Sequence, residues 1–120
     1  MRLFLCDDNA QYRHLARIAL ERAGHEIVGE AGSGQEAIDH APASAPDIVL
    51  LDLYMPGMDG VEALPRLRAV LPHASIVVLS TGQAPDDRRR ALAAGADGFV
   101  VKPERLFTLG DELSAVLGPA

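Results

Sequence analysis

The chain has 120 residues, a formal net charge of −6 at pH 7, 48% hydrophobic residues and 23% charged residues. This length and composition suit one globular domain with a single core and exclude a disordered chain. The negative charge argues against non-specific nucleic-acid binding, and the single cysteine, Cys6, cannot form an internal disulfide. Neither a signal-peptide core nor a run long enough to cross a membrane is visible, so we expect a cytoplasmic protein.

Five short apolar runs alternate along the chain with five segments of helical spacing. Asn9 and Ser33 stand where helix N-caps belong, and Glu36 completes a capping box with Ser33. Pro65 lies inside the third predicted helix, so we expect an irregular first turn there. In chain order, the predicted elements are a strand at 3–6, a helix between Asn9 and Gly24, a strand at 26–30, a helix from Ser33 to about His40, a loop bracketed by Pro42 and Pro46, a strand at 47–51, a helix at 61–70, a strand at 75–80, a helix from Pro85 to Gly95, a strand at 98–101 and a helix from Thr108 to about Leu117.

This alternation predicts an α/β fold with one sheet between two layers of helices. The runs at 3–6, 47–51 and 75–80 are apolar throughout rather than alternating, which indicates strands buried on both faces. Strands separated by helices pair in parallel, and right-handed crossovers place helices on both sides of the sheet. We therefore expect a single domain over 1–120 with a doubly wound (βα)5 architecture and a five-stranded parallel sheet.

Charged and hydroxyl side chains gather where the predicted strands end. In an open parallel sheet, ligands bind at the carboxyl ends of the strands. The residues at these ends are Asp7, Asp8, Asp52, Ser80, Thr81 and Lys102. Three neighbouring carboxylates repel each other and should attract a cation, and ligands that are all oxygen suit Mg²⁺. Ion pairs that only tie the strand ends together are the structural alternative for this set.

The same residues could handle a phosphoryl group. An aspartate can accept a phosphoryl group as an acyl phosphate, and Asp52 is the best candidate because it ends a buried strand and precedes an open turn. Lys102 could neutralise further charge, and Ser80 could donate a hydrogen bond to a phosphoryl oxygen.

Four short motifs make the chain resemble the response-regulator receiver domains of two-component signalling, the family that includes the chemotaxis response regulator. The motifs are the acidic pair Asp7-Asp8, LLDLYMPGMDG around Asp52, VVLS ending at Ser80 and FVVKP with Lys102. Each motif is weak alone, but all four occur in order, each at a strand end, and the resemblance covers residues 2–117. It implies a flavodoxin-like fold with strand order 2-1-3-4-5.

The resemblance also implies a role for each site residue. Asp52 would be the phosphoacceptor, and Asp7, Asp8, Asp52 and the backbone carbonyl of Tyr54 would hold Mg²⁺. Ser80 would be the switch hydroxyl, Phe99 the switch aromatic residue and Lys102 the partner of the phosphoryl group. The bond between Lys102 and Pro103 would be cis.

The implied partners follow from the same family. A sensor histidine kinase or a phosphotransfer protein would donate the phosphoryl group, and slow self-dephosphorylation would reset the switch, so the chain would not be a turnover enzyme. The face of the fourth helix, fifth strand and fifth helix would bind an output protein or domain, or form a homodimer. Neither direct nucleic-acid binding nor a membrane is implied, and no output domain is expected within 1–120.

The chain departs from the family pattern at several positions. Thr81 and Tyr54 are bulky neighbours of the site, and Phe99 lacks the hydroxyl common at its position. The segment 104–107 looks longer than the usual link to the last helix, and Gly110 weakens the first turn of that helix.

Two other functions stay open at this point. A phosphatase that passes through its own aspartyl-phosphate would carry a second acid two residues after the nucleophile, and Tyr54 at that position argues against it. A receiver-like interaction module that is never phosphorylated is the main alternative. The complete set of acidic, hydroxyl and lysine residues argues against such a module, whereas Thr81 and Tyr54 leave it open.

Overall fold

The structure, a computed structural model, describes residues 1–81, 85–102 and 108–117. Five strands alternate with five helices along these residues. The elements are β1 (Arg2–Cys6), α1 (Ala10–Arg22), β2 (Glu26–Ala31), α2 (Gly34–Ser44), β3 (Ile48–Asp52), α3 (Gly60–Val70), β4 (Ser75–Ser80), α4 (Pro85–Ala93), β5 (Gly98–Val101) and α5 (Leu109–Leu117). The predicted bond between Lys102 and Pro103 and the predicted long segment 104–107 lie outside the described residues.

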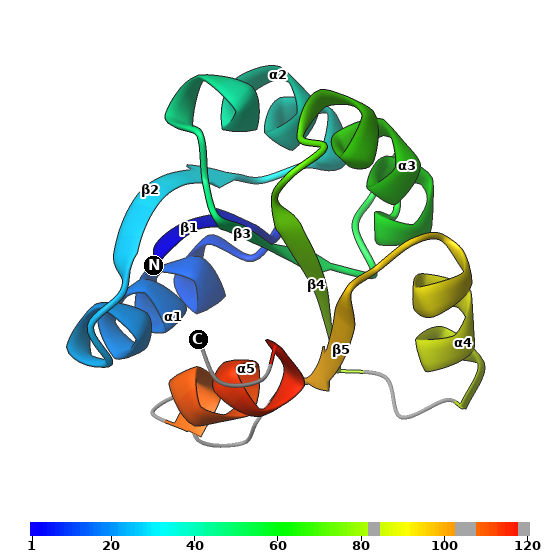
Figure 1. The fold of residues 1–120 in the computed structure, drawn as a ribbon. Coiled ribbons are helices and arrows are strands. Elements are labelled where there is room, and N and C mark those ends of the chain that lie inside the picture. Colours follow the sequence, from blue (N-terminus) through cyan, green and yellow to red (C-terminus); the bar gives the residue numbers. More distant parts are fainter. Residues whose placement is uncertain (82–84, 103–107, 118–120) are drawn as a thin grey trace.

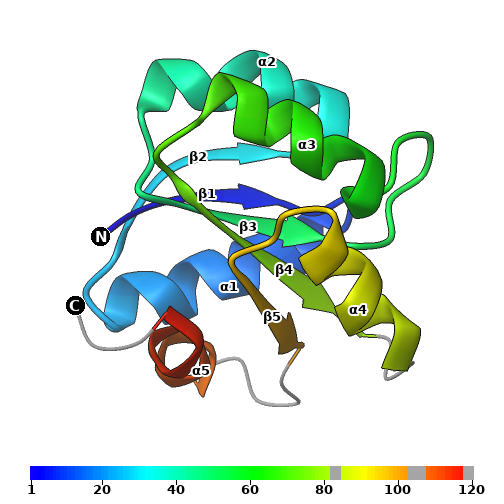
Figure 2. The same ribbon diagram turned by 45° about the vertical axis from the view of Figure 1, so that its right-hand side comes forward.

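The five strands form one parallel sheet in the order β2-β1-β3-β4-β5, as expected (Figure 1). Helices α2 and α3 cover one face of the sheet and α1 and α5 cover the other, while α4 lies beside β5 (Figure 2). The doubly wound (βα)5 prediction is therefore confirmed. Each crossover helix returns the chain to the end of the sheet where the previous strand began, so the carboxyl ends of all five strands lie on the same side.

Packing on both sides of the central strand β3 explains why its apolar residues do not alternate with polar ones. Val49 and Leu51 pack into the core under α2, α3 and α4, whereas Ile48 and Leu50 pack into the core under α1 and α5. All five residues of β3 are buried, including Asp52 at its end. Burial on both faces fixes the backbone of β3 and therefore the place where its last residue stands.

The helix starts follow the predicted caps. The Asn9 side chain accepts a hydrogen bond from the Tyr12 backbone N–H at 3.0 Å, and the Ser33 hydroxyl accepts one from Glu36 N–H at 3.1 Å. The Glu36 carboxylate accepts a weaker bond from Gly32 N–H at 3.4 Å, so this half of the capping box reaches one residue before the cap.

Two predictions about prolines are wrong. Helix α2 continues to Ser44 with Pro42 inside it, because Ala37 and Ala41 are fully buried and the packing of this face extends the helix. Helix α3 is helical from Gly60 onward, so the first turn before Pro65 is not irregular. Every helix in the described ranges is too short or too polar to cross a lipid bilayer.

Gly110 has a role in packing as well as a cost in helix propensity. A Cβ atom at this position would lie 2.9 Å from the Cβ of Ala23, at the end of α1. Glycine therefore lets the first turn of α5 approach α1 closely, which is a gain that sequence propensity alone does not reveal.

Candidate functional site

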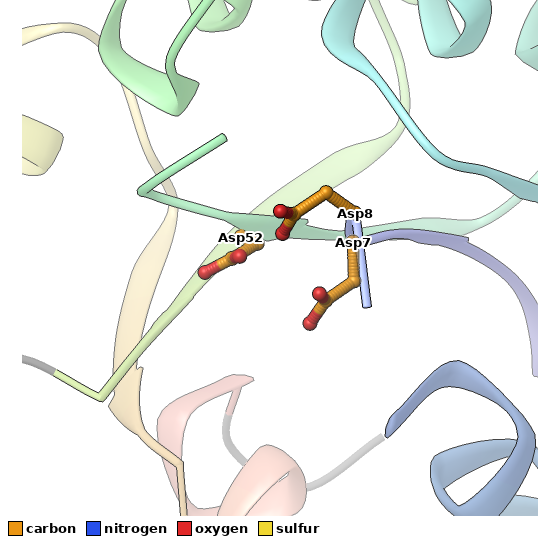
Figure 3. Close-up of side chains that lie close together, drawn as sticks. All are labelled: Asp7, Asp8 and Asp52. Carbon is orange, nitrogen blue, oxygen red and sulfur yellow. The ribbon is translucent and has the colours of Figure 1, made fainter. Parts of the chain in front are cut away.

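Three carboxylates meet at the carboxyl edge of the sheet. Asp7 and Asp8 follow β1, and Asp52 ends the neighbouring strand β3 (Figure 3). One carboxylate oxygen of each residue lies within 4.8 Å of the others. Asp7 and Asp52 are buried, whereas Asp8 is exposed, so the cluster opens to solvent on the side of Asp8. The strand-end prediction therefore placed these three residues together correctly.

Lys102, directly after β5, brings a positive charge into this cluster. Its Nζ lies 2.7 Å from Asp7 Oδ2 and 3.6 Å from Asp52 Oδ1, and only a tenth of its side chain is exposed. The ammonium group also lies over the ring of Tyr12, 4.2 Å from the ring centroid. Two carboxylates and an aromatic face thus fix one lysine in the position that the sequence predicted.

The Asp52 carboxyl has a pKa raised to about 6. Burial is the largest cause, and the negative charges of Asp7 and Asp8 act in the same direction. Lys102 and a hydrogen bond from the Tyr54 backbone N–H oppose the rise. A divalent cation beside Asp52 would favour its ionised form, so proton and metal compete for this carboxylate.

Asp7 is held by contacts that sequence reasoning missed. Its Oδ1 accepts a hydrogen bond from Asn9 N–H at 2.9 Å, and its backbone carbonyl accepts one from the Arg13 guanidinium. Arg13 also pairs with Glu30 at the end of β2, at 3.3 Å. The helical spacing offered one signal, since Tyr12 and Arg13 lie one turn after the Asn9 cap and therefore face the strand ends.

Ser80 and Phe99 lie on the same face of the sheet. Ser80 ends β4 and is fully buried, and its backbone carbonyl accepts a hydrogen bond from Lys102 N–H at 2.8 Å. Phe99 pairs in register with Val78, two residues before Ser80, and packs into the core under α2, α3 and α4. The side chain of Phe99 points inward, and its exposed fraction is 7%. Thr81, directly after β4, is exposed.

Tyr54 reaches across to a helix that the sequence did not connect with the site. The ring is half exposed, and its hydroxyl donates a hydrogen bond to Asp87 Oδ1 in the first turn of α4. This bond and burial raise the pKa of the Tyr54 phenol. No sequence signal pointed to this contact, because the two residues are far apart in the chain and neither belongs to a shared motif.

The donor set suits a hard divalent cation. Its side-chain ligands are all carboxylate oxygens, and one of the three faces solvent and leaves room for water ligands. The one thiol nearby, Cys6, is buried, and burial together with Asp7 and Asp52 raises its pKa to about 12. The neutral thiol is therefore the favoured form of Cys6, and a carboxylate is the better ligand for a hard cation.

Comparisons with known proteins place the chain in a family. The family model of the response regulator receiver domain matches residues 3–113. The chain belongs to this family, the receiver domains of two-component response regulators. Receiver domains are signalling modules rather than turnover enzymes, they bind Mg²⁺ at an acidic pocket, and response regulators interact with kinases and output partners.

Two curated relatives differ in length. The chemotaxis protein CheY of Thermotoga maritima is 36% identical over 102 residues, which cover 85% of each protein. The transcriptional regulatory protein PdtaR of Mycobacterium tuberculosis is 39% identical over 115 residues, which cover 96% of this chain and 54% of PdtaR. The chain spans only about half the length of several such regulators.

Solved structures show the same fold. The signal receiver domain of the response regulator NarL from Mycobacterium tuberculosis superposes with a TM-score of 0.86 at 32% identity, covering 98% of this chain and 97% of that one. A response regulator protein from Burkholderia pseudomallei was solved with a phosphorylated aspartic acid, a calcium ion and citrate. It gives a TM-score of 0.82 at 25% identity, and the match covers 96% of this chain and 65% of that one.

Proposed function

We propose that this chain is a phosphorylation switch whose phosphoacceptor is Asp52. The observation that carries the proposal is the geometry of the acidic cluster. Oxygens of Asp7, Asp8 and Asp52 lie within 4.8 Å of one another, and the Lys102 ammonium lies 2.7 Å from Asp7 and 3.6 Å from Asp52. The phosphorylated aspartic acid in the Burkholderia pseudomallei structure supports the same chemistry here.

The phosphoryl group would come from a phosphohistidine on a sensor kinase or a phosphotransfer protein. A carboxylate oxygen of Asp52 would form a bond to phosphorus while the P–N bond breaks. The electron pair of the P–N bond would go to the imidazole nitrogen of the donor. Asp7, Asp8, Asp52 and the Tyr54 carbonyl would hold Mg²⁺, which would supply positive charge to screen the phosphoryl group from the carboxylates. Lys102 pairs with a phosphoryl oxygen, and the Ser80 hydroxyl donates a hydrogen bond to another.

The readout of this switch would be a surface away from the acidic cluster. Movement of Ser80 toward the phosphoryl group pulls the chain after β4, and Phe99 packs deeper beside it. The face of α4, β5 and α5 then binds an output protein or domain, or a second copy of the chain. Slow hydrolysis of the acyl phosphate resets the switch.

Intact mass measurement tests the phosphoacceptor. The native chain, Asp52→Ala and the control Asp39→Ala, which alters an exposed aspartate of α2, are incubated with acetyl phosphate and Mg²⁺. We expect one phosphoryl group on the native chain and on the control, none on Asp52→Ala, and none on any chain when Mg²⁺ is removed.

Two results would argue against the proposal. Gain of a phosphoryl group by Asp52→Ala would move the acceptor to another residue. No gain by the native chain, together with no binding of the phosphoryl mimic beryllofluoride, would favour a receiver-like interaction module that is never phosphorylated.

A further inference from the structure

Tyr54 contacts both the proposed phosphoacceptor and helix α4. Tyr54 lies two residues after Asp52 and its backbone N–H favours the ionised Asp52 carboxylate, which lowers the pKa of that group. The Tyr54 hydroxyl donates a hydrogen bond to Asp87 Oδ1. Asp52 ends β3, and Asp87 lies in the first turn of α4. A single residue therefore spans the distance between the acidic cluster and a helix on the proposed output face.

The Asp87 end of this connection is well buried. Only 2% of Asp87 is exposed, and among the described residues its Oδ2 has no hydrogen-bond partner. A buried carboxylate is costly unless it is paired, and within the described ranges the side-chain donor to Asp87 is the Tyr54 hydroxyl. The positive end of the α4 dipole adds to the stabilisation. Without the contact to Tyr54, the buried Asp87 carboxylate would lose this hydrogen bond. The folded chain therefore favours the state in which the contact is formed.

A second contact ties the same loop to α4. The guanidinium of Arg90 lies 3.9 Å from Asp59 Oδ2, and Asp59 is the N-cap of α3. The loop between β3 and α3 is thus held to α4 near its start by Tyr54 and at its end by Asp59. Figure 2 shows α4 next to the beginning of α3.

We propose that Tyr54 and Asp87 form a latch that transmits changes at the acidic cluster to helix α4, with Asp87 as a positioning residue for the Tyr54 loop. This inference rests on the proposed function for its metal ligands. Mg²⁺ bound by Asp52 and the Tyr54 carbonyl restrains the backbone on both sides of Leu53, and the Tyr54 hydroxyl passes this restraint to Asp87. The route does not pass through Ser80, so the metal alone is enough to engage it.

Hydrogen exchange of the α4 amides tests the latch. We compare the native chain with Tyr54→Phe, Asp87→Asn, the double variant and Asp86→Asn, whose side chain is exposed and pairs with Arg89 instead. Without metal, we expect about tenfold faster exchange across 87–93 in each latch variant and no further gain in the double variant. Tenfold corresponds to about 1.4 kcal/mol, which is within the range for a hydrogen bond to a charged group.

Adding Mg²⁺ alone then tests transmission, with binding measured in parallel by calorimetry. We expect Mg²⁺ to slow α4 exchange about fivefold in the native chain and in Asp86→Asn, a size at the low end of couplings between sites. The response should vanish in Tyr54→Phe and Asp87→Asn even at saturating Mg²⁺. If the bond between Tyr54 and Asp87 were purely structural, its loss would change the basal exchange of α4 but not the response of that exchange to Mg²⁺.

The outcomes separate the two proposals. Equal basal exchange in the native chain and Tyr54→Phe would overturn the latch, and so would a Mg²⁺ response that survives in both latch variants. If the native chain binds no Mg²⁺, the metal site of the proposed function fails, and transmission through the latch fails with it. Basal exchange then shows whether the contact between Tyr54 and Asp87 holds α4 at all.

Discussion

Asp52 combines a buried position with two acidic neighbours, and this combination governs how the folded chain responds to pH. Its pKa is raised from 3.8 to about 6, so between these values the folded chain binds more protons than the unfolded chain. The stability contributed by this group is fully present below pH 3.8 and is lost as the pH rises through 6. Above pH 6, the ionised carboxylate is a net cost to folding.

We therefore expect Asp52→Asn to raise the free energy of unfolding at pH 7.5 by about 1–2 kcal/mol, since each unit of pKa shift is worth about 1.4 kcal/mol and solvent that reaches the cluster on the side of Asp8 reduces this value. Denaturant unfolding at a series of pH values measures this gain, which should shrink as the pH falls from 6 to 4. Mg²⁺ should stabilise the native chain and not the variant. A gain that does not depend on pH would show that burial of the charge is not its cause.

The residues of the site were predictable to different degrees. Asp7, Asp8, Asp52 and Lys102 could be placed from the sequence because parallel strands bring their carboxyl ends to one edge. The contacts that orient them could not, since the Lys102 ammonium over Tyr12 and the bond between Tyr54 and Asp87 depend on how helices pack against loops. Periodicity fixes which face a side chain occupies but not which distant side chain it meets.

At the scale of elements, helix α3 starts unusually close to the end of β3. A Cβ atom on Gly60 would lie 2.7 Å from the Asp52 carbonyl oxygen and 2.9 Å from the Leu53 Cα. Gly60 N–H also donates a hydrogen bond to the Leu53 carbonyl at 2.7 Å. A glycine at the start of α3 is therefore needed for β3, which carries the proposed phosphoacceptor, to end where it does.

We expect Gly60→Ala to lower the free energy of unfolding by about 1–3 kcal/mol, the usual cost of overpacking, and to weaken Mg²⁺ binding because the end of β3 must move. Thermal unfolding and calorimetric titration with Mg²⁺ measure the two effects. Gly32→Ala is the matched control, because a Cβ atom there would make only an ordinary contact at 3.5 Å with Arg13. Unchanged Mg²⁺ affinity in Gly60→Ala would show that the site tolerates this displacement.

A similar close approach holds α5 against the sheet. A Cβ atom on Gly98 of β5 would overlap Cγ1 of Val116, a side chain with little rotational freedom. We expect Gly98→Ala to cost about 1–3 kcal/mol in unfolding free energy and the added change Val116→Ala to recover part of it. Urea unfolding of the two single variants and the double variant tests this, and strictly additive losses would contradict it.

The error about Pro42 belongs to this scale as well. Sequence reasoning ended α2 near His40 because proline removes a backbone donor and clashes with the preceding turn. Packing of Ala41 into the core outweighs that local cost, and Ala45, in a left-handed conformation, ends the helix instead. Strands and caps were predictable because their signals are local, whereas the extent of α2 depends on tertiary contacts.

At the scale of the whole molecule, the proposed output face carries exposed apolar side chains. Leu92 on α4 is 44% exposed and Val101 on β5 is 41% exposed. Apolar side chains on neighbouring elements favour association once the face adopts its binding-competent form. A homodimer through α4, β5 and α5 would cover both.

We expect Mg²⁺ and beryllofluoride to shift the native chain from monomer to dimer in sedimentation velocity experiments, and Leu92→Ser with Val101→Ser to abolish the shift. Val70→Ser serves as the control, because Val70 is equally exposed at 41% but lies at the end of α3. A monomer under all conditions would exclude the homodimer and leave a separate output protein or domain as the partner of this face.

The buried central strand also constrains how the molecule can respond to any event at Asp52. Because β3 is packed on both faces, its backbone resists displacement more than the exposed segments around it. Displacements caused by a new group on Asp52 must then appear in the parts around the strand: the loop to α3, the end of β4, and α4. The direction of signalling is thus set by where the fold is stiff, before any partner binds.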